Sequence, residues 1–273
     1  MKIVVCVKHV PGQQADRRFD AAGRLVRGEE DVLSELDENA IEAAVGLAET
    51  QEQAGREVEV VALTLGPDGA QAAARRALQM GAARGVHVLD ERAAGSDALA
   101  TARILAAAVR REGDVDLVVT GSASADGMTS LLAPALATVL GVPALTHAIG
   151  VEVAGATVTV RREAPSADEV LAAPLPAVVS VTDQANSPRY PNMKALLAAK
   201  KKHVEAISLD DLGLGGPDAP VGAVGVRVVA AEVAAPRTAG QIVPDSGQGG
   251  RHLARWLNEH DLVATRTGAE AHA

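Results

Sequence analysis

The sequence has few aromatic residues and almost no cysteine. Of its 273 residues only Phe19, Tyr190 and Trp256 are aromatic, so the core must be assembled from Ala, Val and Leu. The single cysteine, Cys6, excludes an intramolecular disulfide and fits a reducing compartment. Because Cys6 lies within the first apolar run, we expect its side chain to pack as a small buried hydrophobe rather than to act as a nucleophile.

Charge and apolar patterning argue against two further classes of protein. The formal net charge of −9 disfavours a general nucleic-acid binder, because such proteins cluster Lys and Arg opposite phosphates. The one basic run, at residues 200–202, is typical of a solvated helix end. The apolar run at residues 1–7 is far shorter than the ~18 residues of a membrane span and has no cleavage-site pattern. We therefore expect no membrane insertion and a cytoplasmic protein.

Motifs for catalysis and metal binding are missing as well. There is no G-x-x-x-x-G-K-[ST], and the glycine-rich pieces at 213–216 and 247–250 do not follow a strand as a dinucleotide fingerprint requires. The seven histidines are scattered without an H-E-x-x-H pattern, so we expect no metal site. Ser122 and Ser124 have no evident His–Asp partners. We predict no catalytic residue in this chain.

Apolar strand patterns alternate with helical patterns through the first half of the chain. Strands are predicted at 2–7, 58–65, 86–89 and 117–120, and helices at 37–50, 68–80, 98–111 and 131–140. Near-continuous hydrophobic strands joined by helices indicate a parallel sheet covered on both faces. The predicted fold class is therefore α/β, a Rossmann-like three-layer fold with a mostly parallel sheet. Asp68 is a predicted helix N-cap, and Gly81 and Gly141 are predicted helix ends.

The pattern changes after Gly141. Residues 148–153 and 157–162 flank Ala154-Gly155-Ala156 as in a hairpin, and 177–181 is a further predicted strand, so we expect the sheet to gain antiparallel members. Turn-rich composition at 213–220 and 236–250 indicates linkers, followed by a short helix at 252–258. We predict a Rossmann-like domain at 1–235 and an arm at 236–273. The arm buries little by itself and is expected to lie against another chain, with a frayed end at 267–273.

Loops that leave the carboxyl ends of parallel strands are the usual ligand sites of such folds. Three loops qualify, starting at Lys8, at Gly66-Pro67 and at Gly121. The third, residues 121–130, is the best candidate, because its glycines and small hydroxyl residues let backbone N–H groups approach a phosphate at the start of the next helix. Asp126 would accept hydrogen bonds from loop amides or contact a ribose. From the pattern alone, an ordinary strand-to-helix turn is the competing interpretation.

A proline-stiffened loop precedes the basic run. Pro188 and Pro191 keep this loop out of the helix that follows, so Arg189, Tyr190 and Met193 are expected to be presented for docking rather than packed. Taken alone, a Met one turn into an amphipathic helix would be a core residue. The whole tract resembles the signature segment of electron transfer flavoprotein β subunits, in which a matching Pro-Arg-Tyr and a short helix ending in lysines form a recognition loop for dehydrogenases.

The resemblance covers nearly the whole chain, with matches at 4–8, 76–82, 175–179 and 238–240. It implies that this subunit holds AMP. Two positions depart from the family pattern: Ser34-Glu-Leu-Asp37 stands where many members have an Asn-Pro pair, and Leu131 stands where Gln is common, which favours AMP over a second FAD. Carried over position by position, the implied nucleotide-binding residues are Cys6, Ser34, Asp37, Leu65, Gly121, Ser122, Ala123, Ser124, Ala125, Asp126, Gly127, Met128, Thr129 and Ser130.

The resemblance also implies a function and partners. The chain would be the β subunit of a heterodimer that carries electrons from dehydrogenases, such as the acyl-CoA dehydrogenases of fatty acid oxidation, to a membrane quinone reductase. The electrons would pass through a FAD held mainly by the α subunit, on which the arm would pack. Arg189, Tyr190 and Met193 would bind dehydrogenases.

Glu163 would meet the flavin domain of the partner, although a solvated hairpin charge is the competing interpretation. Two alternatives to this function stay open. One is a flavin-bifurcating relative that carries a second FAD in this subunit. The other is a stand-alone adenine-nucleotide-binding protein, similar to universal stress proteins or adenine nucleotide hydrolases.

Overall fold

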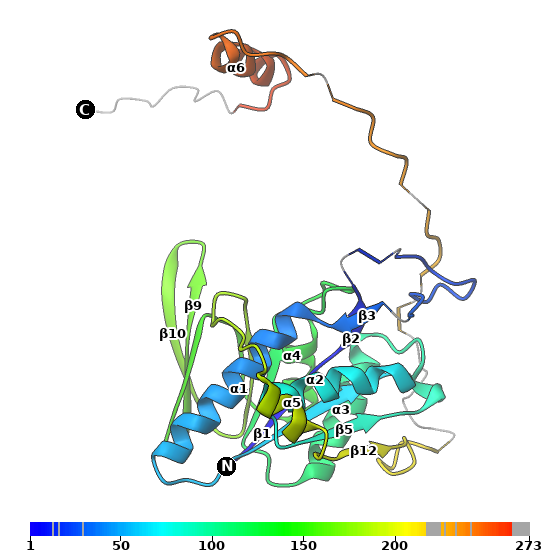
Figure 1. Ribbon diagram of the computed structural model, residues 1–273, viewed down its shortest axis with the longest axis vertical. Helices are drawn as coiled ribbons and strands as arrows, with labels where there is room; N and C mark the ends of the chain where they lie inside the picture. Colours follow the sequence, from blue (N-terminus) through cyan, green and yellow to red (C-terminus); the bar gives the residue numbers. More distant parts are fainter. Residues whose placement is uncertain are drawn as a thin grey trace. The chain divides into compact units, whose positions relative to one another are not determined.

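The computed structural model describes residues 1–12, 14–15, 17–28, 30–216, 225–226, 228–232, 234–240 and 242–263. The chain divides into two compact units, Met1–Ala231 and Glu232–Ala273. Figure 1 draws both units, coloured along the sequence.

The first unit is built on a seven-stranded sheet in which all neighbouring strands are parallel. Its central strands are apolar and almost fully buried, as a sheet covered on both faces requires. From one edge to the other, the strands are β12 (Val204–Ile207), β5 (Arg84–Val88), β4 (Glu59–Leu65), β1 (Lys2–Cys6), β6 (Leu117–Gly121), β11 (Ala177–Val181) and β7 (Ala144–Ala148).

Helices cover both faces of this sheet (Figure 1). The apolar clusters to which alternate residues of β1 belong show which helices lie on which face. Ile3 and Val5 belong to one apolar cluster with residues of α1 (Glu35–Gln53) and α2 (Gln71–Met80). Val4 and Cys6 belong to a second cluster with residues of α3 (Ala98–Glu112) and α4 (Leu132–Leu140). This arrangement of layers confirms the predicted fold class and the burial of Cys6.

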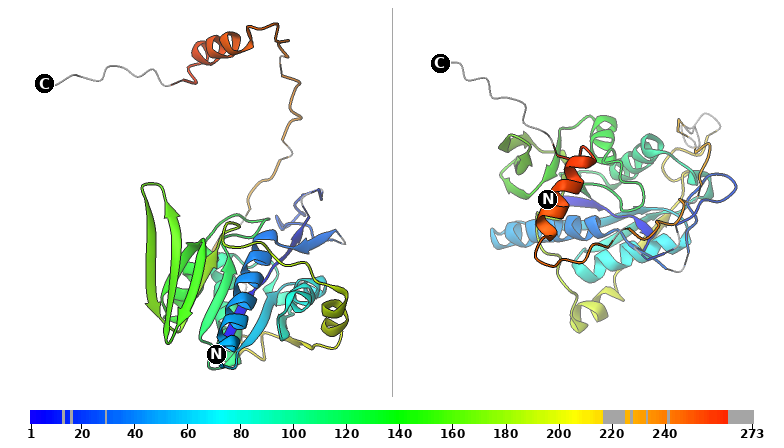
Figure 2. Two further views of the ribbon diagram at one scale, coloured as in Figure 1. Left: turned by 60° about the vertical axis from the view of Figure 1, so that its left-hand side comes forward. Right: turned by 90° about the horizontal axis from the view of Figure 1, so that it is seen from above.

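The antiparallel strands form a sheet of their own beside the main one (Figure 2). The prediction that they join the main sheet is wrong. Val158 and Val160 face the core next to Leu145, whereas many of their neighbours along the strands are exposed, and strands with one solvated face cannot lie inside a doubly covered sheet. The strands are β8 (Gly150–Ala154), β9 (Thr157–Ala164) and β10 (Ala167–Pro174), and the predicted turn at Gly155 joins β8 to β9.

Two of the three predicted helix-capping residues lie at the ends of helices, as expected. Gly81 and Gly141 end α2 and α4 with φ of 131° and 76°, values that favour glycine. The prediction that Asp68 is an N-cap is wrong, because Asp68 is the first residue of a 3₁₀ helix, η1 (Asp68–Ala70). This tight turn closes through the Ala70 N–H, which donates to the Pro67 carbonyl at 2.8 Å.

Several short elements have no counterpart in the sequence prediction. Residues 9–11 and 31–33 pair as a short antiparallel ladder on either side of a polar loop. A second 3₁₀ turn follows β5, and the Asp90 side chain caps it by accepting from the Arg92 N–H at 2.9 Å. These elements are β2 (His9–Pro11), β3 (Asp31–Leu33) and η2 (Glu91–Ala93).

The proline-stiffened loop leads into the short helix α5 (Met193–Ala199), as predicted. The Asn192 side chain caps this helix by accepting a hydrogen bond from the Ala195 N–H at 2.9 Å. The basic run is not simply a solvated helix end, because Lys202 Nζ donates to the Ala82 carbonyl at 2.6 Å, just beyond α2. Burial lowers the pKa of Lys202. The run therefore ends in a lysine that anchors α5 beside α2.

The second unit contains the helix α6 (Gly249–Glu259), where a helix at 252–258 was predicted. Trp256 stacks on His260 with ring centroids 4.3 Å apart, and both Leu253 and Trp256 are exposed within their own unit. Packing of this unit on a partner chain stays a prediction. In the described parts of the chain, no helix has both the length and the apolar character needed to cross a membrane.

Two leucines of α3 test the burial that the structure assigns to the core. Leu105→Ala should lower the free energy of unfolding by about 2–5 kcal/mol, because the Leu105 side chain on α3 is only 4% exposed and its truncation leaves a cavity. Leu99→Ala on the same helix, where the side chain is 49% exposed, should cost less than about 1 kcal/mol. Urea unfolding followed by far-UV circular dichroism measures both. Equal losses in the two variants would contradict the assigned burial.

Candidate functional site

The loops predicted to bind a ligand leave neighbouring strands. Because β4, β1 and β6 are adjacent, the loops after their last residues start at the same edge of the sheet. From β1 the chain continues through α1 to β4 on one side, whereas from β6 it continues through α4 to β7 on the other. The strand order therefore reverses between β1 and β6, and open α/β sheets bind ligands at such a position.

A buried carboxyl group holds this edge together. Asp37, in the first turn of α1, is only 6% exposed. Its Oδ2 accepts a hydrogen bond from the backbone N–H of Lys8 at 2.8 Å, and the backbone N–H of Gly121 also donates to the carboxyl group. Burial raises the pKa of Asp37 to about 7, against the opposing effect of these two N–H groups. Asp37 thus ties the start of α1 to the ends of β1 and β6.

The loop after β6 packs directly on the start of α1. A Cβ at Gly121 would lie 2.7 Å from Asp37 Oδ1 and 2.8 Å from the Leu36 carbonyl group, so this close approach requires glycine. Ser34 occupies the N-cap position of α1, but its side chain makes no capping bond and its Oγ instead accepts from the Ala125 N–H at 3.2 Å. Gly121 and Ser34 are predicted nucleotide contacts, and here they shape the loop that would hold the nucleotide.

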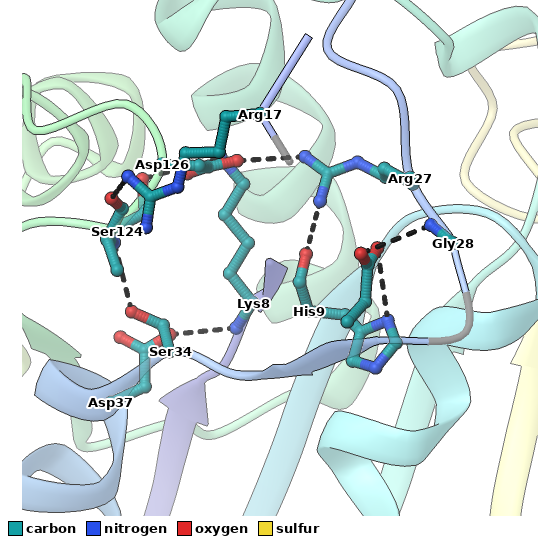
Figure 3. Close-up of polar contacts among 11 residues, drawn as sticks. Lys8, His9, Arg17, Arg27, Gly28, Ser34, Asp37, Ser124 and Asp126 are labelled. Atoms are coloured by element: carbon teal, nitrogen blue, oxygen red, sulfur yellow. Dashed lines mark hydrogen bonds and ion pairs between the residues drawn. The ribbon is translucent and has the colours of Figure 1, made fainter. Parts of the chain in front are cut away.

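Three basic side chains converge on the same loop (Figure 3). Lys8 Nζ donates to Asp126 Oδ1 at 2.8 Å, and Arg27 Nη2 donates to Asp126 Oδ2 at 2.9 Å. Arg17 Nη1 donates to the Ala125 carbonyl at 3.3 Å. Burial by itself would raise the pKa of Asp126, but the charge and hydrogen bond of Lys8, with a smaller effect of Arg27, bring the pKa below its usual value. Asp126 therefore stays ionised and binds side-chain cations.

None of these basic residues was among the predicted site residues. Lys8 directly follows an apolar strand, and that position is a usable sequence signal. Arg17 and Arg27 lie in the polar loop between β2 and β3, where no local pattern distinguishes them from other charges. Arg27 is held in place by a second hydrogen bond, which it donates to the His9 carbonyl. Burial lowers the pKa of His9, although the adjacent Asp31 opposes this shift.

The donors at this edge fit a nucleotide phosphate. Lys8 and Arg27 supply ammonium and guanidinium groups, which are the usual side-chain ligands of phosphates. The first N–H groups of α4 have no side-chain cap, because the N-cap residue is Leu131, and a bound anion can satisfy such groups. The hydroxyl groups of Ser34 and Ser124 add polar contacts. The site therefore has cationic side chains and backbone donors of the kind that bind a phosphate group.

The remaining predicted nucleotide contacts lie along the same edge. Burial, followed by the charge of Asp37, raises the pKa of the Cys6 thiol to about 12, so this thiol stays protonated. Leu65, at the end of β4, packs against the second apolar cluster. Ser122, Ala123 and Ser130 are half-buried, whereas residues 127–129 are exposed. Contacts of these residues with a nucleotide stay predictions.

The predicted docking residues are placed in different ways. Tyr190 and Met193 are 93% and 70% exposed, as expected of presented side chains. Arg189 is not presented freely, because its guanidinium is bound to two glutamates of α1 in ion pairs of 2.8 and 2.6 Å, and that part of the prediction is wrong. Glu163 is exposed on β9. The partner-binding roles of all four residues stay predictions.

The raised pKa of Asp37 gives a prediction for stability against pH. Because its pKa is about 7 in the folded chain and 3.8 otherwise, the folded state binds this proton more tightly. The resulting stabilisation is complete below about pH 4 and is lost as the pH rises through about 7. Relative to Asp37→Asn, the wild-type chain should lose on the order of 2–4 kcal/mol between these limits. Urea unfolding from pH 4 to pH 8 measures the difference, and parallel profiles would contradict the assignment.

Comparisons with known proteins agree on one family. The family model described as electron transfer flavoprotein domain matches residues 23–212. An electron transfer flavoprotein subunit beta from Mycobacterium tuberculosis is 37% identical over 263 residues, which cover 96% of this chain and 99% of the relative. The subunit beta from Megasphaera elsdenii is 32% identical over 82% of this chain and 84% of its own length. Protein FixA from Azorhizobium caulinodans is 36% identical over 78% and 77%. With the family model and full-length relatives in agreement with the fold, the chain belongs to the electron transfer flavoprotein β subunit family.

Proposed function

We propose that this chain is the β subunit of a heterodimeric electron carrier, which takes electrons from dehydrogenases and passes them to a membrane quinone reductase. The observation that carries the proposal is the convergence of the β1, α1 and β6 ends around Asp37 and Asp126, in a chain that aligns with β subunits over nearly its full length. A FAD held mainly by the α subunit would accept and release the electrons. The residues of this chain would bind and orient, without bond-making chemistry of their own.

Within the complex, this chain would hold AMP as a structural ligand. Lys8 and Arg27 would neutralise the phosphate, and the first N–H groups of α4 would donate to its oxygens. Asp126 already binds both cations, so their charge is in position before a nucleotide arrives. This preorganisation reduces the cost of ordering side chains on binding.

The second unit supports the proposal of a partner chain. An isolated helix of 11 residues is marginal in water, and α6 exposes Leu253 and Trp256 within its own unit. An amphipathic helix is stabilised when its apolar face is buried against another surface. The α subunit is the partner we assign, and Glu163 on β9 would meet its flavin domain.

Nucleotide content tests the cofactor assignment. After co-expression with the genomic neighbour most similar to an α subunit, denaturing release and chromatography should give one FAD and one AMP per heterodimer. A Lys8→Met, Arg27→Met double variant should lose AMP, because it removes the two side chains proposed to bind the AMP phosphate. It should keep FAD, because FAD would be held mainly by the α subunit. Two FAD would replace the AMP assignment with the flavin-bifurcating alternative. Absence of both a partner and a flavin would overturn the proposal in favour of the stand-alone nucleotide-binding class.

Docking of dehydrogenases is tested at the exposed methionine. Met193→Ala should lower kcat/KM for reduction of the complex by an acyl-CoA dehydrogenase roughly 5- to 30-fold, since truncating an apolar interface anchor costs about 1–2 kcal/mol. Flavin and AMP content should not change. Leu99→Ala, another exposed truncation but on α3, is the control. Unchanged kinetics in Met193→Ala would remove this residue from the docking surface.

A further inference from the structure

The loop before α5 is fastened to α1 by a pair of asparagines. Asn39 Nδ2 donates to the Asn186 carbonyl at 3.0 Å, and Asn186 Nδ2 donates back to the Asn39 carbonyl at 3.0 Å. Asn39 is buried in the second turn of α1, so these bonds are partly shielded from water. The first residue of the tract at 186–202, which we call the docking segment, is therefore fixed to the helix.

Arg189 makes the second attachment, through two forked ion pairs. Its Nε and Nη2 donate to the two carboxylate oxygens of Glu42 at 2.8 and 3.0 Å. Its Nη1 and Nη2 donate to the two oxygens of Glu49 at 2.6 and 3.0 Å. The Arg189 backbone N–H adds a bond to Glu42 at 3.1 Å, so main chain and side chain are held by the same carboxylate.

This arrangement depends on the shape of the guanidinium group. Glu42 and Glu49 are seven residues apart, which places them two turns apart on one face of α1. A planar fork with five N–H donors can bridge two carboxylates in this way, whereas a lysine ammonium offers a single charged point. The hydrogen bond from Arg189 lowers the pKa of Glu49, and the two glutamates raise the pKa of Arg189, so Arg189 and Glu49 stabilise one another in their charged forms.

The far end of the docking segment is held as well. Lys202 Nζ donates to the Ala82 carbonyl, and Arg75 Nη1 donates to the Lys202 carbonyl at 3.1 Å. Between Arg189 and Lys202, the side chains of Tyr190, Met193 and Leu197 are exposed, and Met193 and Leu197 are one helical turn apart on α5. Apolar side chains are thus displayed on a stretch of backbone that is fixed at both ends.

We propose that Arg189 is a positioning residue, which holds the docking segment in the conformation that a donor dehydrogenase recognises and does not itself contact the dehydrogenase. Four of its hydrogen bonds already go to α1, which leaves little of the guanidinium for a partner. A segment ordered before binding loses less conformational freedom on docking, and affinity rises accordingly. The inference rests on the proposed function, because it assigns a role in dehydrogenase docking.

The test uses the αβ complex with Arg189→Lys, Glu42→Gln and the double variant. The control is Arg111→Lys, because Arg111 also forms a forked pair, with Glu205, but on α3 and β12. Hydrogen exchange of the amides at 189–199 is measured without a dehydrogenase. KM and kcat are then measured with an acyl-CoA dehydrogenase and its acyl-CoA as the donor.

Arg189→Lys and Glu42→Gln should each speed exchange in the docking segment and raise KM about tenfold, with kcat and flavin content unchanged. The double variant should be no worse than either single variant, because all three break the same attachment. Arg111→Lys should match wild type in both measurements.

Two results would overturn the positioning role. One is unchanged exchange in Arg189→Lys. The other is a rise in KM for Arg189→Lys with none for Glu42→Gln, which would mean direct contact with the dehydrogenase. A wild-type complex that the dehydrogenase cannot reduce would instead overturn the proposed function, and the exchange rates would still report whether Arg189 orders the segment.

Discussion

The hydrogen bonds that the Asp37 carboxyl group accepts from Lys8 and Gly121 fix where α1 begins. They join the first turn of the helix to the ends of two neighbouring strands, β1 and β6, which lie more than 100 residues apart in the sequence. Once this turn is fixed, the other contacts of α1 follow from helical geometry. Ser34 meets the loop after β6, while Asn39, Glu42 and Glu49 meet the docking segment.

The helix α1 is consequently the element that relates the nucleotide site to the docking surface. Asp37 and Glu49 are twelve residues apart, which corresponds to about 18 Å along the axis. A well-packed helix keeps such a separation constant, because its backbone hydrogen bonds and its buried face resist bending. Ala40, Ile41 and Ala44 provide that face against the sheet. A nucleotide held as proposed would stabilise the first turn of α1. Because the docking segment is attached further along the same helix, the nucleotide would in this way contribute to docking.

Sequence patterns predicted the parts of this structure that depend on local signals. The central strands and the four long helices follow hydrophobic periodicity, and the helix ends at Gly81 and Gly141 follow backbone preference. The separate antiparallel sheet was mistaken for part of the main one, because strand periodicity does not say which strands pair. At the site, Gly121 could be placed by its position after a predicted strand, whereas Asp37 was placed only by the resemblance to the family. The partners of Asp126 and Arg189 could not, since ion pairs between distant segments leave no local pattern.

The aliphatic core also limits what optical spectroscopy can measure in this protein. Of the three aromatic residues, Phe19 and Tyr190 are exposed in the first unit, and Trp256 belongs to the second. Near-ultraviolet circular dichroism and intrinsic fluorescence arise from aromatic side chains. They are therefore insensitive to the packing of Ala, Val and Leu around the sheet. In a flavin-containing complex the same scarcity becomes useful: this chain contributes one indole donor, so its energy transfer to the flavin would measure the position of α6 with little background from the rest of the chain.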